Sequence, residues 1–230
     1  MASIAIITAR GGSKRIPKKN IKEFCGRPII AYSIEAAINS NVFDEVMVST
    51  DDEEIARIAK EYGAKVPFLR SEESANDFAT TADVISEVLE EYEKLGRSFE
   101  SFTCIYPTAP FVTDRKLKEA SKLFLDSKSD GLMTVVPFSF PPQRGMVLND
   151  GTLEYLHPEY EKSRSQDLPK IYHDCGQFYM CKVESFLKFK SLVMPMTIPF
   201  VIREEEAQDI DNLSDWVIAE CKYQAMNKGK

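Results

Sequence analysis

A basic, glycine-containing stretch near the amino terminus is the first place where this sequence could do chemistry. Residues 9–20 read ARGGSKRIPKKN and include five lysines and arginines but no acidic residue, although the whole chain has 29 basic and 36 acidic residues and a formal net charge of -7. The stretch follows a short apolar run at residues 4–7, which is typical of a buried strand. Backbone N–H groups in such a turn, together with basic side chains, bind phosphate oxygens. The stretch therefore predicts a polyphosphate site, with a solvated basic loop as the alternative.

The spacing of the glycines matches neither the P-loop pattern GxxxxGK[ST] nor the dinucleotide pattern GxGxxG. Two adjacent glycines let the backbone approach a ligand closely, and several positive groups suit the charge that spreads over phosphate oxygens in a transition state. The candidate phosphate ligands are Arg10, Gly11, Gly12, Ser13, Lys14, Lys19 and Asn20.

A pair of acidic residues near the carboxyl terminus is the natural counterpart. In an extended segment, side chains two residues apart point to the same side, so Asp209 and Asp211 could reach one cation. Mg²⁺ commonly takes one or two carboxylates together with phosphate oxygens and waters. The apolar Ile210 between the acids favours this interpretation, whereas the acidic residues 204–206 just upstream favour a solvated acidic run.

Two further polar segments could contact the rest of a nucleotide ligand. Residues 70–81 follow a predicted strand, on the side where doubly wound sheets bind ligands, and Arg70 could donate to a base carbonyl while backbone groups read the base edge. Gly176-Gln177-Phe178-Tyr179 combines a small residue with amide and aromatic groups that suit a sugar-like ligand. A plain loop and a core tyrosine are the respective alternatives.

Composition limits the class of protein. The chain has 230 residues, of which 43% are hydrophobic and 28% charged, as in an ordinary soluble globular domain. The acidic balance argues against general nucleic-acid binding, and the sequence predicts neither a membrane span nor a signal peptide. The five cysteines form no CxxC pair, so we expect reduced thiols and a cytoplasmic location.

Strand and helix patterns alternate through the first half of the chain. This alternation predicts an α/β fold with a doubly wound, mainly parallel, Rossmann-like sheet. Capping signals are expected at Thr50 or Asp51, at Thr80 with Asp83, at Thr113, and at Asn212 with Asp215. The expected strands are 4–8, 45–49, 65–69, 102–106, 132–136, 177–181 and 197–202, and the expected helices are 29–38, 53–62, 80–95, 115–125, 183–189 and 212–226, with Pro28 at the first helical position.

Residues 138–172 interrupt this rhythm with four prolines and many aromatic residues. The turn sequence Asn149-Asp150-Gly151 predicts a hairpin between 146–148 and 152–156. An excursion of this length inside a single domain of 230 residues needs a purpose. We expect a dimerisation arm, with a lid over the site as the alternative.

Taken together, these motifs resemble the acylneuraminate cytidylyltransferases, the CMP-sialic acid synthetase group, nearly from end to end. The strongest parts are residues 9–14 with Lys19-Asn20, the VSTD at 48–51, Arg70 with DFATT at 77–81, PTAP at 107–110 and DID at 209–211. The segments RSQD at 164–167 and YHDCGQFY at 172–179 look most like the pseudaminic acid cytidylyltransferases. The differences from the N-acetylneuraminate members include Tyr106 and His173, and they lie where the sugar should bind.

This resemblance implies a nucleotide-diphospho-sugar transferase fold and a reaction between CTP and a nine-carbon acidic sugar that gives a CMP-sugar and pyrophosphate. It also implies Mg²⁺ on Asp209 and Asp211, and a homodimer whose arm reaches the partner's sugar site. Catalytic roles are expected for Arg10, Lys14, Lys19 and Asp211, without a clear general base. Nucleotide contacts are expected from residues 10–14, Lys19, Asn20, Arg70, Asp77, Ala79 and Thr81, and sugar contacts from Tyr106, Pro107, Thr108, Arg144, His173, Gln177, Phe178 and Tyr179.

Other functions remain open at this point. The sugar could be N-acetylneuraminic or legionaminic acid instead of pseudaminic acid. Without the resemblance, a nucleotide-binding protein that does no chemistry would also fit a basic glycine turn. A kinase-like phosphotransferase is a third possibility, which the missing P-loop disfavours.

Overall fold

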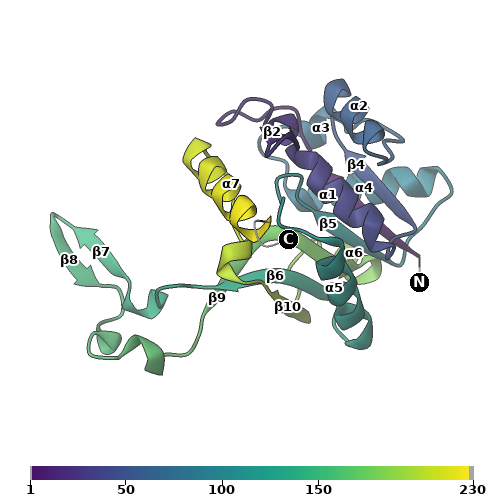
Figure 1. Ribbon diagram of the computed structural model, residues 1–230. Coiled ribbons are helices and arrows are strands. Elements are labelled where there is room, and N and C mark those ends of the chain that lie inside the picture. Colours follow the sequence, from purple (N-terminus) through teal and green to yellow (C-terminus); the bar gives the residue numbers. More distant parts are fainter. Residues whose placement is uncertain (1, 228–230) are drawn as a thin grey trace.

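A six-stranded mixed sheet forms the centre of the computed structural model, which describes residues 2–227 (Figure 1). The strand order is β10-β6-β9-β5-β1-β4. All neighbours pair in parallel except β9, which runs antiparallel to both β5 and β6. The predicted mainly parallel α/β sheet is therefore confirmed, but the reversed strand was not predicted. The strands are β1 (Ser3–Thr8), β4 (Glu45–Ser49), β5 (Ser101–Ile105), β6 (Gly131–Pro137), β9 (Tyr172–Lys182) and β10 (Thr197–Val201).

Helices cover both faces of the sheet. One buried cluster joins β1 to side chains of α1, α2 and α5, and the other joins it to α4 and α6. Alternate residues of β1, such as Ile6 and Ile7, enter the two clusters in turn, because successive side chains of a strand point to opposite faces. The helices are α1 (Ile29–Ser40), α2 (Glu53–Glu61), α3 (Glu72–Ala75), α4 (Thr81–Lys94), α5 (Asp114–Asp126), α6 (Val183–Phe189) and α7 (Leu213–Asn227).

Side-chain caps fix where several helices begin. The predicted capping box of Thr80 and Asp83 opens α4, and Thr113 caps α5 by accepting from Lys116 N. The cap of α2 is Asp52, so the prediction of Thr50 or Asp51 was wrong: Asp52 Oδ1 accepts from the backbone of both Glu54 and Ile55.

The first residues of α7 also carry the predicted pair of caps. Asn212 Oδ1 accepts from Asp215 N at 3.1 Å, and Asp215 Oδ2 accepts from Asn212 N at 2.9 Å. The start of this helix is therefore fixed directly after the acidic pair Asp209 and Asp211.

Two local predictions were wrong. Residues 65–69 form no strand, because Lys65 alone bridges to Met47 and Pro67, which lacks an N–H, cannot extend the pairing. Pro28 is not the first helical residue. It ends β3 (Arg27–Pro28), which pairs with β2 (Glu23–Phe24) in a short antiparallel hairpin, and it takes the N-cap position of α1.

Residues 138–172 project away from the sheet as an arm (Figure 1). The chain leaves the sheet after β6 and re-enters it at the start of β9. These two strands are neighbours, and Pro137 pairs with Tyr172, so both ends of the arm lie side by side. The predicted hairpin is present as β7 (Met146–Asn149) and β8 (Thr152–Tyr155), joined by Asp150 and Gly151 with φ of 47° and 83°. Short 3₁₀ turns η2 (Pro142–Arg144), η3 (Pro158–Tyr160) and η4 (Ser165–Asp167) complete the arm, while η1 (Lys19–Ile21) and η5 (Glu204–Glu206) belong to the main body.

Among the described residues, no helix is long and apolar enough to cross a membrane.

Candidate active site

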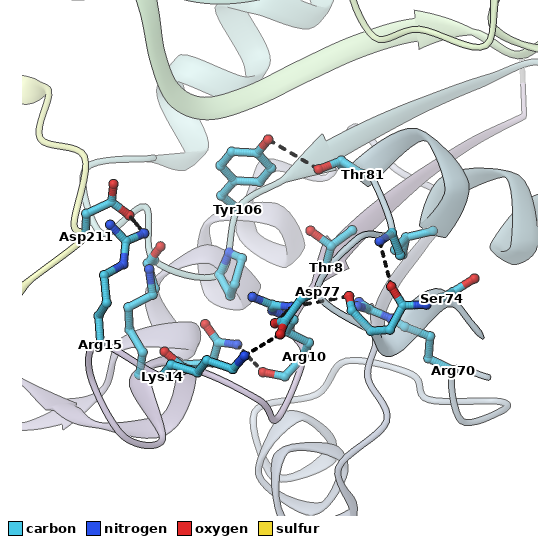
Figure 2. A pocket seen from close by; sticks show the side chains of 18 of the residues that line it. Thr8, Arg10, Lys14, Arg15, Arg70, Ser74, Asp77, Thr81, Tyr106 and Asp211 are labelled. Atoms are coloured by element: carbon cyan, nitrogen blue, oxygen red, sulfur yellow. Dashed lines mark hydrogen bonds and ion pairs between the residues drawn. The ribbon is translucent and has the colours of Figure 1, made fainter. Parts of the chain in front are cut away.

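A polar cavity of about 580 Å³ lies at the edge where β1 and β5 end (Figure 2). This is the edge of a parallel sheet at which α/β proteins bind ligands. The cavity brings together all three polar segments that the sequence predicts for a nucleotide. It is lined by Thr8, Arg10, Ser13, Lys14, Arg15, Lys19, Asn20, Arg70, Ser74, Asn76, Asp77, Ala79, Thr81, Val84, Tyr106, Pro107, Thr108, Asp209 and Asp211.

The basic turn forms one wall of this cavity. Asn20 Nδ2 donates to the carbonyl of Arg10 at 2.8 Å and so ties the two ends of the turn together. Arg10 Nη1 lies 2.9 Å from Asp77 Oδ1, and Lys14 forms an ion pair with the same carboxylate (Figure 2). These ion pairs lower the pKa of Asp77, with the Lys14 contact as the larger cause. The arrangement places a carboxylate between two cations in the cavity where a phosphate is expected.

The two glycines of the turn do not line the cavity. Gly11 N donates to Asp51 Oδ1 at 2.9 Å, and a Cβ at Gly11 would lie 2.9 Å from Asp52 Oδ2. Gly11 is therefore required for close packing against the start of α2. Gly12 has open space around it. In this arrangement, neither glycine supplies the expected phosphate cradle.

The acidic pair lies directly beside the basic turn. Lys19 Nζ donates to the carbonyl of Ile210 at 2.7 Å, and Arg15 Nη2 lies 2.6 Å from Asp211 Oδ1. Ile210 is buried in an apolar cluster, as the sequence indicated, while Asp209 and Asp211 line the cavity. Burial lowers the pKa of Lys19, and the two carboxylates partly oppose this effect.

The chemistry of this donor set fits a divalent cation. Burial, followed by the negative charge of Asp211, raises the pKa of Asp209, and a bound cation would favour the ionised form of both carboxylates. No group of three or more metal-ligating side chains occurs among residues 2–227. Two carboxylates are enough for Mg²⁺ when phosphate oxygens and waters complete its coordination.

The segment between α2 and α4, which is a loop interrupted by the short α3, supplies the third wall. Arg70 is 8% exposed, and it donates to Ser49 Oγ at 3.0 Å and to Ser49 O at 2.7 Å. Burial lowers its pKa. The Arg70 side chain is thus held in one orientation at the cavity wall by strand β4.

Sequence reasoning missed two cavity residues in this loop, Ser74 and Asn76. Asn76 Oδ1 accepts from the backbone of Phe78 and Ala79, at 2.8 and 2.9 Å, and thereby shapes the turn that presents Ala79 to the cavity. An asparagine four residues before a predicted helix start is a recognisable turn signal.

The expected sugar contacts divide into separate groups. Tyr106, Pro107 and Thr108 follow β5 and line the same cavity. His173 instead lines an adjoining cavity of about 390 Å³, which shares Asp209 with the first. Arg144 lies in the arm, where its Nη1 donates to Ser165 Oγ at 3.3 Å and its Nε is buried without a partner.

The remaining three expected sugar ligands are buried in β9. Phe178 is fully buried in the main core, so it cannot touch a ligand in this structure, and that prediction was wrong. Tyr179 packs under Tyr106 with ring centroids 5.7 Å apart and donates to Asp174 Oδ2. Gln177 Nε2 donates to the carbonyl of Glu206 at 2.6 Å. Tyr179 thus packs against Tyr106, which lines the cavity, and Gln177 holds the backbone at Glu206; neither of the two lines the cavity itself.

A family model described as cytidylyltransferase matches residues 4–192. The chain belongs to the cytidylyltransferase family. It is 41% identical to the pseudaminic acid cytidylyltransferase of Campylobacter jejuni over 224 residues, which are 97% of each chain. It is 32% identical to the CMP-N,N'-diacetyllegionaminic acid synthase of Legionella pneumophila, over 96% of this chain and 95% of that protein.

The fold comparison agrees with this family. A solved CMP:2-keto-3-deoxy-manno-octonic acid synthetase complexed with CTP superposes with a TM-score of 0.71 and 16% identity, covering 99% of this chain and all of that one. The resemblance inferred from the sequence motifs is thus confirmed, and the cytidylyltransferase chemistry of the family accounts for a cavity lined by both cations and carboxylates.

Proposed function

We propose that this protein is a pseudaminic acid cytidylyltransferase, which joins CTP and pseudaminic acid into the CMP-sugar and releases pyrophosphate. The observation that carries the proposal is that Arg10, Lys14 and Lys19 line the same cavity as Asp209 and Asp211. Among sugars, pseudaminic acid is favoured because the relative from Campylobacter jejuni is 41% identical over almost the whole length of both chains.

In this proposal, the basic turn holds the triphosphate. Arg10, Lys14 and Lys19 contact phosphate oxygens and stabilise the pyrophosphate as it leaves, because charge develops there in the transition state. Ser13 and Asn20 add hydrogen bonds at the same wall, and the nucleotide's base lies against Arg70, Ala79 and Thr81.

Asp209 and Asp211 would hold Mg²⁺ together with the triphosphate. Bound there, the ion would neutralise charge on the α-phosphate during displacement. The chain's own contribution is to keep both carboxylates at the cavity wall: Lys19 holds the carbonyl between them, and Arg15 holds Asp211.

The sugar is proposed to lie beside Tyr106, Pro107, Thr108 and His173, where the two cavities meet at Asp209. Its anomeric hydroxyl then attacks the α-phosphorus in line. The arm is proposed to mediate a homodimer and to bring Arg144 to the partner's sugar, since Arg144 contacts neither cavity of its own chain. All five cysteines are free thiols, which suits a cytoplasmic enzyme.

The test incubates the purified protein with CTP, Mg²⁺ and pseudaminic, legionaminic or N-acetylneuraminic acid in parallel. Pyrophosphate release should depend on the added sugar and be fastest with pseudaminic acid, and mass spectrometry should detect the CMP-sugar. Lys19→Met serves as the inactive control. CTP binding without any sugar-dependent pyrophosphate would indicate a non-catalytic nucleotide-binding protein, and formation of CDP would indicate a phosphotransferase.

A further inference from the structure

A buried ion pair lies directly upstream of the acidic pair. Lys116, on α5, is 6% exposed, and its Nζ lies 2.9 Å from Glu206 Oε2 and donates to the carbonyl of Phe111 at 3.0 Å. Burial lowers the pKa of Lys116, and the contact with Glu206 opposes this shift. None of these groups lines the nucleotide cavity, so the proposed reaction leaves the ion pair without a role.

The backbone around Glu206 is held by further side chains from distant parts of the chain. Gln177 Nε2, from β9, donates to Glu206 O at 2.6 Å. Lys222 Nζ, from α7, donates to Ala207 O at 2.7 Å and to Glu204 O at 3.2 Å. Three elements of the fold therefore converge on this short stretch.

The distance along the chain makes this convergence relevant to the site. Asp209 is three residues beyond Glu206, so the chain between them spans at most about 10 Å. Ala207 is buried within this interval and Ile210 is buried directly after it, which leaves little slack. A shift of the backbone at Glu206 would therefore move Asp209.

We propose that Lys116 is a positioning residue for the metal-binding carboxylates: its ion pair with Glu206 fixes the backbone that carries Asp209 and Asp211. This inference rests on the proposed function, in which these two residues hold Mg²⁺ with the triphosphate. Stability alone does not account for the pair, because a buried ion pair can often be replaced by apolar residues of similar volume at no cost. What the charged pair adds is a single fixed geometry for the segment.

The test measures how strongly metal and nucleotide binding are coupled, without sugar or turnover. Calorimetry gives the Kd of CTP in EDTA and in saturating Mg²⁺, and the ratio of the two reports the contribution of the metal site. The variant Lys116→Met/Glu206→Met removes both charges together and so leaves no unpaired buried charge. We expect its Kd in EDTA to stay within about twofold of wild type, while the ratio falls by about tenfold, which corresponds to a coupling energy of about 1.4 kcal/mol.

Control variants separate the possible outcomes. Lys118→Met, on the exposed side of the same helix, should leave the ratio unchanged. Lys222→Met removes two bonds to the same segment without leaving a buried charge, so it should also lower the ratio, and it gives the answer if the double variant does not fold.

An unchanged ratio of the CTP Kd in EDTA to that in Mg²⁺ is the outcome that counts against the inference. The role of Lys116 would be overturned if the folded double variant kept a ratio within twofold of wild type. If the double variant fails to fold, the same result in Lys222→Met would overturn it. Asp211→Asn tests the underlying assumption separately: if it too leaves the ratio unchanged, the proposed metal site itself is wrong.

Discussion

Asp77 is the residue whose substitution gives the most informative outcome for nucleotide binding. Its carboxylate pairs with both Arg10 and Lys14 inside the proposed triphosphate site (Figure 2). A triphosphate would have to take over these two cations and would meet the negative charge of Asp77. We therefore expect Asp77→Asn to bind CTP more tightly than the wild-type protein.

The size of the effect follows from the exposure of the groups. The side chains of Arg10, Lys14 and Asp77 are 40%, 77% and 44% exposed. Solvent therefore screens both ion pairs, and each holds its partners together only weakly. Removing two such competing contacts should lower the Kd of CTP by about threefold to tenfold. Because exposed charges are screened by salt, the gain should shrink at high ionic strength.

Calorimetric titration of CTP in EDTA, at low salt and again at high salt, checks both expectations. Asp114→Asn is the matched control, since it removes an exposed acid that pairs with Lys118 on α5, away from the cavity. Weaker CTP binding by Asp77→Asn would refute the reasoning, because Asp77 would then contact the nucleotide itself, as the resemblance implies.

Three further predictions follow from the same structure. Lys19→Met and Asp211→Asn should each lower kcat for pyrophosphate release by at least about 10²-fold, the scale of a lost transition-state charge contact, and near wild-type kcat in either would remove that residue from the mechanism. Glu45→Gln should reduce the free energy of unfolding in urea by about 3 kcal/mol, because the buried Glu45 carboxylate accepts from Lys65, Tyr92 and Arg97; an unchanged midpoint would argue against this network. Heterodimers of Arg144→Ala with Lys19→Met subunits should keep one intact site if the arm acts in the partner's site, whereas complete inactivity would contradict that arrangement.

The same Glu45 network predicts how stability depends on pH. Burial alone would raise the pKa of Glu45, but hydrogen bonds from Lys65, Tyr92 and Arg97 outweigh burial and lower it. A carboxyl whose pKa is lower in the folded state stabilises the protein above the unfolded pKa of about 4.3, and this contribution is lost as the pH falls through the folded value. Urea unfolding at several pH values between 3 and 6 should thus show a smaller slope in Glu45→Gln than in the wild-type protein.

Periodicity and capping signals were sufficient for most of the fold. Thr80 with Asp83 and Thr113 were identified correctly because a side-chain cap is a local feature with fixed spacing. The prediction that Thr50 or Asp51 caps α2 failed for a tertiary reason, since Asp51 accepts from the backbone N–H of Gly11, which lies 40 residues away in the chain.

The reversed direction of β9 could not be predicted from the pattern of its residues. A buried strand reads as the same apolar run whether its neighbours are parallel or antiparallel. The direction is instead decided by the arm, which leaves after Pro137 and returns to pair Tyr172 with that same residue. Phe178 was misjudged as a sugar ligand for a related reason: in β9 it points into the main core, whereas Tyr179, next to it, points to the other face.

The reversed direction of β9 also bears on how the proposed nucleotide and sugar sites are separated. In the proposed nucleotide site, the loops after β1 and β5 follow parallel strands, so they sit at the carboxyl edge by topology alone. An antiparallel strand instead presents its first residues at that edge, which places His173 and Asp174 beside Asp209. Since the arm enters β9 at the same point, we expect sequence changes in the arm and in the start of β9 to alter the proposed sugar site without disturbing the loops proposed to hold CTP. Of the two differences from the N-acetylneuraminate members that the resemblance implies, His173 lies at the start of β9, whereas Tyr106 follows β5 and packs on Tyr179 of β9.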